Sequence, residues 1–229
     1  MKEVDEGIFL HRTNYSESSL ILTLYTKHSG LRKFIFKGGK KKAHNLYPLS
    51  VSELTYFGRK ESELLQLTSA ETVELFEFPF DPVRSTIAFF VVEILRKCIH
   101  EGEKDDRLYV FIRKEIDRLE RSESLSYFPL TFLIGLAGIL GFQPMIEGGD
   151  PLVFHLNEGR IDSYSRVAED VDSGEHVRLI AQLINNEIPV ESGKVIRDRA
   201  MDTLLKYYSM QLPGLDELKT LSIVKEVLA

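Results

Sequence analysis

The sequence predicts an α+β protein in which a small all-β domain of five strands is followed by a bundle of α-helices. Three observations support this prediction. Apolar and polar residues alternate with a period of two in short runs up to residue 80, Asp81-Pro82 forms a helix-start signal, and apolar residues beyond it recur at helical spacing. We therefore expect a first domain at 1–80 and a helical domain at 81–229, with an irregular insertion at about 143–174.

The first 80 residues contain five runs typical of β-strands. Leu20, Leu22 and Leu24 share one face of their run, and Phe34 and Phe36 share one face of the next, which is the period of a half-buried strand. Turn residues separate the runs and no helical pattern intervenes, which indicates a small antiparallel barrel or sandwich. The expected strands are Val4–Leu10, Leu20–Tyr25, Leu31–Lys37, Val51–Phe57 and Leu64–Leu75.

The helical part begins at Asp81, whose side chain can cap a helix, and Pro82 suits the first turn because that position needs no amide donor. Apolar residues then recur at helical spacing until Gly102 ends the pattern. A small hairpin is expected where Phe154-His155-Leu156 is followed by a turn and Arg160-Ile161. Further helices are expected at about Asp106–Arg121, Tyr127–Leu140, His176–Asn185, Lys194–Met210 and Leu215–Leu228.

Length and composition narrow the class of protein. The chain has 229 residues, 43% of them hydrophobic and 28% charged, which is typical of a folded soluble protein of one large or two small domains. The first residues, MKEVDEG, lack the apolar segment of a signal peptide. The longest apolar run, Phe128–Phe142, is too short and too rich in glycine to cross a bilayer. We expect a soluble, cytoplasmic protein with no membrane contact.

Charge is unevenly distributed along the chain. The net charge is −6, yet residues 1–80 carry 11 Lys/Arg against 10 Asp/Glu, and no acidic residue occurs between Glu17 and Glu53. Such an uncompensated run predicts a positive surface that binds nucleic-acid phosphates, the alternative being an ordinary solvated loop. The candidate DNA-binding residues are those of the run, Lys27, Arg32, Lys33, Lys37, Lys40, Lys41 and Lys42, extended by Arg59 and Lys60 in the turn before the last strand.

Signatures of catalysis are missing. The sequence contains no phosphate-binding loop, no nucleophile elbow and no zincin motif. The single cysteine, Cys98, lies on the apolar side of its helix and is expected to be a packed core thiol. One acidic cluster can be interpreted either as a site for a hard cation or as a solvated loop that caps the next helix. Its members are Glu169, Asp170, Asp172, Glu175 and His176. We expect no enzyme activity, no cofactor and no metal.

A small barrel that carries a basic loop and precedes a helical domain is typical of an oligonucleotide-binding (OB) fold with an appended domain. The residues that carry a closer match are Gly7–Leu10, Tyr15–Thr26, Gly30-Leu31, Phe36–Gly39, Gly58-Arg59 and Ser69–Glu71, with weaker echoes in Leu140–Pro144 and Leu218–Leu221. In these residues the sequence resembles the RecO family of bacterial recombination mediators.

The resemblance implies a five-stranded OB-fold β-barrel, an α-helical bundle domain with a short irregular or hairpin insertion, and no catalytic activity. It implies binding to single- and double-stranded DNA and annealing of complementary strands. It also implies partners: RecR, the acidic tail of the single-stranded-DNA-binding protein (SSB) and, indirectly, the recombinase RecA. Such a protein is expected at the nucleoid. Many members carry a four-cysteine zinc module, but residues 143–164 contain no cysteine, so we expect no structural zinc.

The resemblance leaves several assignments open. Tyr25, Tyr56 and Phe57 are interpreted either as stacking faces for bases or as packing residues. A binding site for the SSB tail is expected on the second helix, at Arg113, Lys114, Arg118 and Arg121. The alternative is that these cations and the acidic residues between them form an ordinary solvated face. The favoured function is a non-enzymatic DNA-binding and annealing mediator. The alternatives are a protein–protein adaptor with little DNA affinity and a metal-dependent nuclease that uses the acidic cluster.

Overall fold

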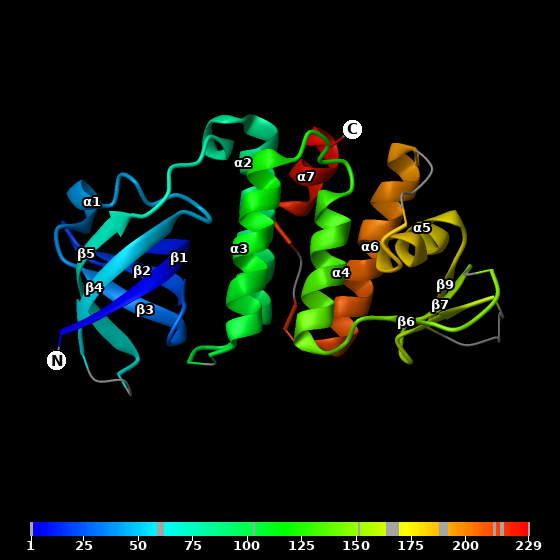
Figure 1. The fold of residues 1–229 in the computed structure, drawn as a ribbon, viewed down its shortest axis with the longest axis horizontal. Helices are drawn as coiled ribbons and strands as arrows, with labels where there is room; N and C mark the ends of the chain where they lie inside the picture. Colours follow the sequence, from blue (N-terminus) through cyan, green and yellow to red (C-terminus); the bar gives the residue numbers. More distant parts are fainter. Residues whose placement is uncertain are drawn as a thin grey trace. The chain divides into compact units, whose positions relative to one another are not determined.

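The structure is a computed structural model that describes residues 2–58, 62–102, 104–150, 152–163, 170–187, 192–212, 214–215 and 218–228. The chain forms two compact units, Met1–Arg121 and Ser122–Ala229. The first unit holds the barrel and the first two long helices, and the second holds the remaining helices and a small sheet (Figure 1). The expected domain boundary between residues 80 and 81 stays a prediction.

Five strands form a closed barrel in the order β1-β2-β3-β5-β4, with β4 returning to β1. The predicted five-stranded barrel is confirmed, but the expectation of wholly antiparallel pairing is wrong, because β3 and β5 run parallel from Lys33↔Leu64 to Phe36↔Leu67. Strand directions cannot alternate all the way around a closed ring with an odd number of strands, so one pair must be parallel. The strands are β1 Lys2–Asn14, β2 Leu20–Thr26, β3 Gly30–Phe36, β4 Val51–Phe57 and β5 Leu64–Thr72.

The barrel interior is filled by the alternating apolar residues of its strands. Phe34 is fully buried and meets the Tyr56 ring edge-on, with ring centroids 5.2 Å apart. Gly7 permits close approach of β1 to the core, because a Cβ there would come within 2.6 Å of Leu54 Cδ1. The buried cluster comprises Phe9, Leu20, Leu22, Leu24, Phe34, Phe36, Ala43, Leu46, Leu54, Tyr56, Leu65 and Leu67.

Between β3 and β4 the chain makes one helical turn, α1 Gly39–Lys42. A 3-10 turn, η1 Phe78–Phe80, precedes the first long helix. Neither turn was expected from the sequence. Helix α2 spans Pro82–Cys98, and its cap is as predicted, because Arg84 N donates to Asp81 Oδ1 at 2.9 Å. Helix α3 spans Asp106–Arg121, as predicted.

Helix α2 ends four residues before the expected stop at Gly102. Gly102 N donates to Leu31 O at 3.0 Å, and Glu101 forms a parallel bridge with Leu31. Residues that pair with a strand cannot also continue a helix, so contact with the barrel decides where α2 ends.

The second unit contains four helices: α4 Phe128–Leu140, α5 Glu175–Ile184, α6 Lys194–Gln211 and α7 Leu221–Val227. The predicted hairpin is present as β7 Val153–His155 and β8 Arg160–Asp162. The insertion expected at 143–174 also contains two strands that were not expected, β6 Met145–Ile146 and β9 Val171–Ser173, which complete a four-stranded sheet of order β6-β8-β7-β9. Strands of two or three residues are too short to show a period in the sequence.

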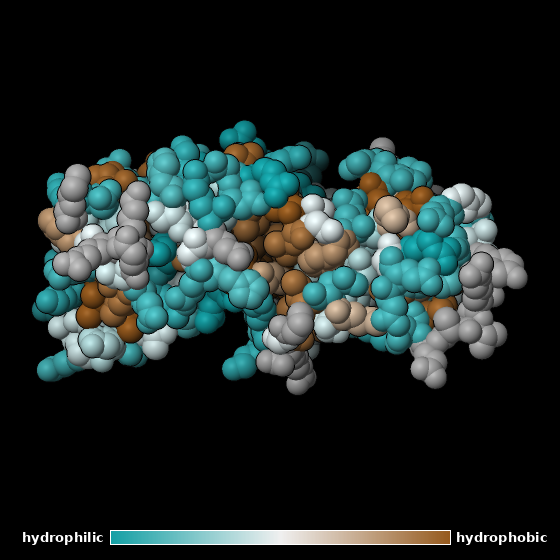
Figure 2. Space-filling model, turned by 90° about the horizontal axis from the view of Figure 1, so that it is seen from below, coloured by the Kyte–Doolittle hydropathy of each residue, from teal (hydrophilic) through white to brown (hydrophobic). Residues whose placement is uncertain are grey.

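Aromatic side chains join the helices and the small sheet of this unit. Tyr208, fully buried on α6, donates to Leu133 O at 2.6 Å and packs against Phe142 with ring centroids 4.9 Å apart. The neighbouring Tyr207 packs against Phe154 of β7 at 5.1 Å. Among the residues that the structure describes, no helix is both long and apolar enough to span a membrane. Hydrophilic residues cover much of the face drawn in Figure 2.

Candidate nucleic-acid interface

The candidate cations lie in two groups at opposite ends of β3. Lys27 follows β2, while Arg32 and Lys33 occupy the first half of β3. The other group surrounds α1, beyond the last residue of β3, and comprises Lys37, Lys40, Lys41 and Lys42. A strand rises about 3.3 Å per residue, so Lys33 and Lys37, four residues apart, are separated by about 13 Å along the strand. The described candidates extend along β3 and into α1, and their assignment to DNA binding stays a prediction.

We call Lys37, Lys40, Lys41 and Lys42 the α1 lysine group. Gly38 adopts a positive φ of 69°, which turns the chain from β3 into α1. Lys40 N donates to Ser18 O at 3.3 Å, and the buried Ala43 anchors the end of the turn in the barrel core. This anchoring leaves all four lysine side chains exposed.

The α1 lysine group is available to an external anion. In the described part of the chain, the ion pairs made by lysine involve Lys33, Lys104 and Lys225, not these four residues. Lys42 Nζ lies 5.8 Å from the centroid of the Phe36 ring, within the range of a cation–π contact. The group is thus a cluster of positive charge with which no described carboxylate forms an ion pair.

The other group is partly engaged within the protein. Arg32 Nη2 donates to Ser62 O at 2.9 Å, and Lys33 forms an ion pair with Glu101, while Lys27 is exposed. Near these residues a pocket of about 220 Å³ opens at the end of the barrel. Its lining includes Glu3, His28, Arg32, Tyr56 and Lys104, so both signs of charge meet there. Arg59 and Lys60 lie outside the described residues.

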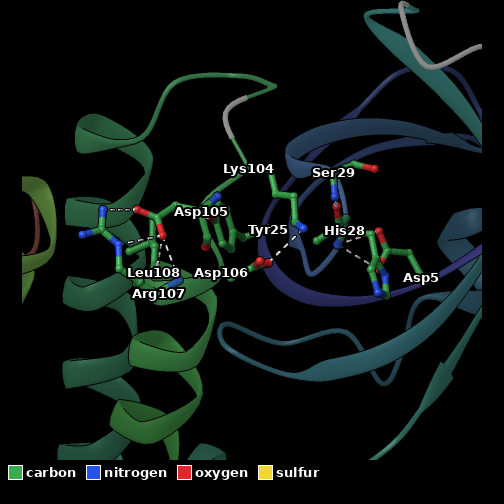
Figure 3. Close-up of polar contacts among 10 residues, drawn as sticks. Asp5, Tyr25, His28, Ser29, Lys104, Asp105, Asp106, Arg107 and Leu108 are labelled. Carbon is green, nitrogen blue, oxygen red and sulfur yellow. Dashed lines mark hydrogen bonds and ion pairs between the residues drawn. The ribbon is translucent and has the colours of Figure 1, made fainter.

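Two of the three aromatic residues considered as stacking faces for bases are buried, and the third is exposed. Tyr25 is fully buried, stacks against Tyr109 of α3 with ring centroids 6.4 Å apart, and its hydroxyl donates to Asp105 O at 3.2 Å (Figure 3). Tyr56 is also buried. Both are packing residues, whereas Phe57 keeps 44% of its surface exposed.

Tyr15 is an aromatic candidate that the sequence reasoning missed. It lies in the β1–β2 connection, is 59% exposed, and its backbone N donates to Ser19 O at 3.1 Å. The neighbouring Ser18 accepts the hydrogen bond from Lys40 N, so Tyr15 and α1 belong to the same end of the barrel. The sequence does contain a signal for this residue. Tyr15 lies in a turn, outside the alternating apolar pattern of the strands, so its ring is not expected in the core.

The expected partner dock on α3 is not a uniform row of free cations. Arg113 Nη2 pairs with Glu74 at 2.7 Å, and Arg118 Nη2 pairs with Glu115 at 2.5 Å. Burial raises the pKa of Glu115 above its ordinary value, despite the nearby arginine. Lys114 and Arg121 are exposed. The helix presents two cations outward and commits two to contacts within its own unit.

The acidic cluster of the second unit is a hydrogen-bonded network. Asp172 Oδ1 lies 3.0 Å from His176 Nε2, and Thr203 Oγ1 donates to Asp172 Oδ2 at 2.5 Å. Glu175 pairs with Arg178 at 2.6 Å, and Asp170 accepts from Asn157 at 2.7 Å. Glu169 lies outside the described residues. Within the residues described, no group of three or more His, Cys, Asp or Glu side chains has an arrangement that could hold a metal ion.

Cys98 occupies the core position expected of it. It is 4% exposed, and burial raises the pKa of its thiol to about 12. The thiolate needed for nucleophilic chemistry is therefore disfavoured at neutral pH.

Asp172 links β9 to α5 and α6, and its charge is expected to stabilise the second unit. Burial by itself raises the pKa of Asp172, but hydrogen bonds from Thr203 and the neighbouring His176 outweigh burial and lower it below the ordinary value. Such a carboxylate stabilises the fold above the unfolded-state pKa of about 3.9, and its contribution is lost as pH falls through the folded-state value. We expect Asp172→Asn to cost about 1–2 kcal/mol of unfolding free energy at pH 7.

Urea unfolding of the wild type and of Asp172→Asn at several pH values measures the difference in unfolding free energy. The difference should be full at neutral pH and shrink below about pH 4, where the unfolded chain takes up a proton on this carboxylate before the folded protein does. A difference of the same size at pH 7 and pH 3 would contradict a role for the charge.

Comparisons with known proteins agree with the fold. Residues 1–76 match the family model of the recombination protein O N terminal domain, and residues 79–148 match that of its C terminal domain. The chain is 25% identical over 233 residues to the DNA repair protein RecO of Flavobacterium psychrophilum, with 97% of each chain covered. It is 26% identical to the protein of that name from Bacteroides fragilis and 27% identical to that from Porphyromonas gingivalis, with 96% of this chain and 97% of each relative covered. With a closed five-stranded barrel, two matching family models and relatives of nearly equal length, the chain belongs to the RecO family.

Proposed function

We propose that this chain is a non-enzymatic mediator that binds single- and double-stranded DNA through its barrel and anneals complementary strands. Membership of the RecO family gives it a role in DNA repair and recombination. The observation that carries the proposal is the α1 lysine group, four exposed lysines held by a barrel of the OB type and unpaired with any carboxylate that the structure describes. The buried thiol of Cys98 and the hydrogen-bonded carboxylates around Asp172 support a function without catalysis.

The physical basis of the proposal is contact with the DNA backbone. Lysines that neutralise phosphates release condensed counterions, and this favours binding irrespective of base sequence. Tyr15 and Phe57 add exposed rings on which a base can stack without being read. A strand held by its phosphates keeps its base edges free, which is the condition that annealing requires.

The protein partners belong to the same proposal. We propose that the chain acts with RecR to help load RecA on SSB-coated strands at the nucleoid. A dock for the acidic SSB tail requires an accessible cation, and on α3 Lys114 and Arg121 meet this requirement better than the ion-paired Arg113 and Arg118.

Fluorescence anisotropy of a labelled single-stranded oligonucleotide, titrated at several salt concentrations, tests the proposal. The logarithm of the affinity should fall linearly with the logarithm of the salt concentration, by about 0.7 for each phosphate neutralised. The oligonucleotide should stay intact with magnesium present. Weak, salt-independent binding would favour the adaptor, and magnesium-dependent loss of DNA would favour a nuclease.

A further inference from the structure

The residues after α2 extend the barrel beside the first half of β3. β5 pairs with β3 only from Lys33 onward. Leu31 instead bridges Glu101 in a parallel register and accepts a hydrogen bond from Gly102 N at 3.0 Å. Residues 101–102 therefore take the place that a longer β5 would occupy.

This pairing brings a carboxylate to a cation of the candidate interface. Glu101 forms an ion pair with Lys33, and both side chains are about half exposed, at 45% and 46%. The two residues line a hollow of about 180 Å³ together with Arg32 and Glu63. Two cations thus face two carboxylates in a space open to solvent.

The segment is also held at its other end. Tyr25 Oη donates to Asp105 O at 3.2 Å and accepts from Asp105 N at 3.3 Å, and Figure 3 shows Tyr25 reaching from the barrel to Asp105. The Glu101 carboxylate is at the end of a flexible, half-exposed side chain, so it can rotate away from Lys33 without breaking these backbone contacts. The ion pair is therefore reversible while the segment stays in place.

We propose that Glu101 occupies a phosphate subsite of the barrel, formed by Lys33 and Arg32, and that bound DNA displaces it. This inference rests on the proposed DNA binding. A carboxylate and a phosphate oxygen offer the same kind of acceptor to a cation, and an exposed ion pair is weak enough for a polyanion to exchange. Glu101 acts as an internal competitor, so it lowers the affinity for DNA. Lys33 still contributes to the salt dependence, because its contact with a phosphate releases counterions condensed on the DNA, whichever group Lys33 paired with before.

The variant Glu101→Gln tests this inference, because it removes the charge and keeps the size of the side chain. We expect single-stranded DNA to bind about two- to fivefold more tightly, as exposed ion pairs of this kind contribute little free energy. The salt slope should stay close to that of the wild type, because Lys33 neutralises a phosphate in both complexes. Glu71→Gln is the matched control, because it makes the same change of net charge at an exposed residue of β5.

A second pair of variants shows whether Lys33 mediates the effect. Lys33→Met should lower the salt slope by about 0.7, because one phosphate contact is lost, and in that background Glu101→Gln should give no more gain in affinity than Glu71→Gln does. Equal gains from Glu101→Gln and Glu71→Gln, or a gain from Glu101→Gln that persists when Lys33 is replaced, would overturn the subsite. Either result would leave DNA binding by the wild-type protein, and hence the proposed function, standing. Failure of both wild type and Glu101→Gln to bind DNA would overturn both.

Discussion

Replacement of Lys40, Lys41 and Lys42 by glutamate is expected to weaken binding of a single-stranded oligonucleotide by about a hundredfold at low salt, because three phosphate contacts are lost. All three side chains are exposed on α1, whose attachment to the barrel runs through the backbone and through Ala43. The fold should therefore survive. The slope of log affinity against log salt should fall by about 2, since each contact contributes about 0.7.

A control variant separates the position of the charges from their number. Glutamate at Lys114, Lys194 and Lys206 makes the same change of net charge on two helices outside the barrel, α3 and α6. This variant should bind nearly as well as the wild type, and circular dichroism should show both variants folded. If the two triple variants lose affinity equally, the α1 lysine group is not a localised site.

Tyr25→Ala is expected to lower the free energy of unfolding of the barrel unit by about 3–5 kcal/mol, the range for truncating a large buried aromatic ring. Tyr25 is fully buried, stacks against Tyr109 and bonds Asp105, so its loss removes packing between β2 and α3 as well as a hydrogen bond. Urea denaturation followed by circular dichroism measures the change.

Tyr25→Phe distinguishes packing from hydrogen bonding and from base stacking. It should cost only about 1 kcal/mol, because only the hydroxyl contact is lost. Its affinity for single-stranded DNA should equal that of the wild type, since a ring with no exposed surface cannot stack on a base. Near-native stability of Tyr25→Ala, or a loss of DNA affinity in Tyr25→Phe, would contradict the packing role.

Patterns of adequate length predicted their elements well. The alternation in Leu20–Thr26 and Gly30–Phe36 predicted β2 and β3 to within one residue at each end, and the apolar spacing in Asp106–Arg121 predicted α3 at both ends. These signals are local, because the period of a strand or helix alone decides which of its residues share the face that packs on the core.

Apart from the β7–β8 hairpin, the short or contact-dependent elements were not predictable. The strands of the small sheet have two or three residues, and the hydrogen bonds that define them join segments such as Val153–His155 and Val171–Ser173, which are distant in sequence. The early end of α2 has the same origin, because it depends on pairing between Glu101 and Leu31.

The sequence by itself determined which residues are cationic, where the strands and long helices lie, and which family the chain resembles, because composition, period and motif are properties of adjacent residues. Only the tertiary structure decided how those cations are used. It exposed the α1 lysine group, paired Lys33 with Glu101 and buried Tyr25 against α3. Burial and ion pairing depend on which distant segments meet, and packing settles this only when the whole chain has folded.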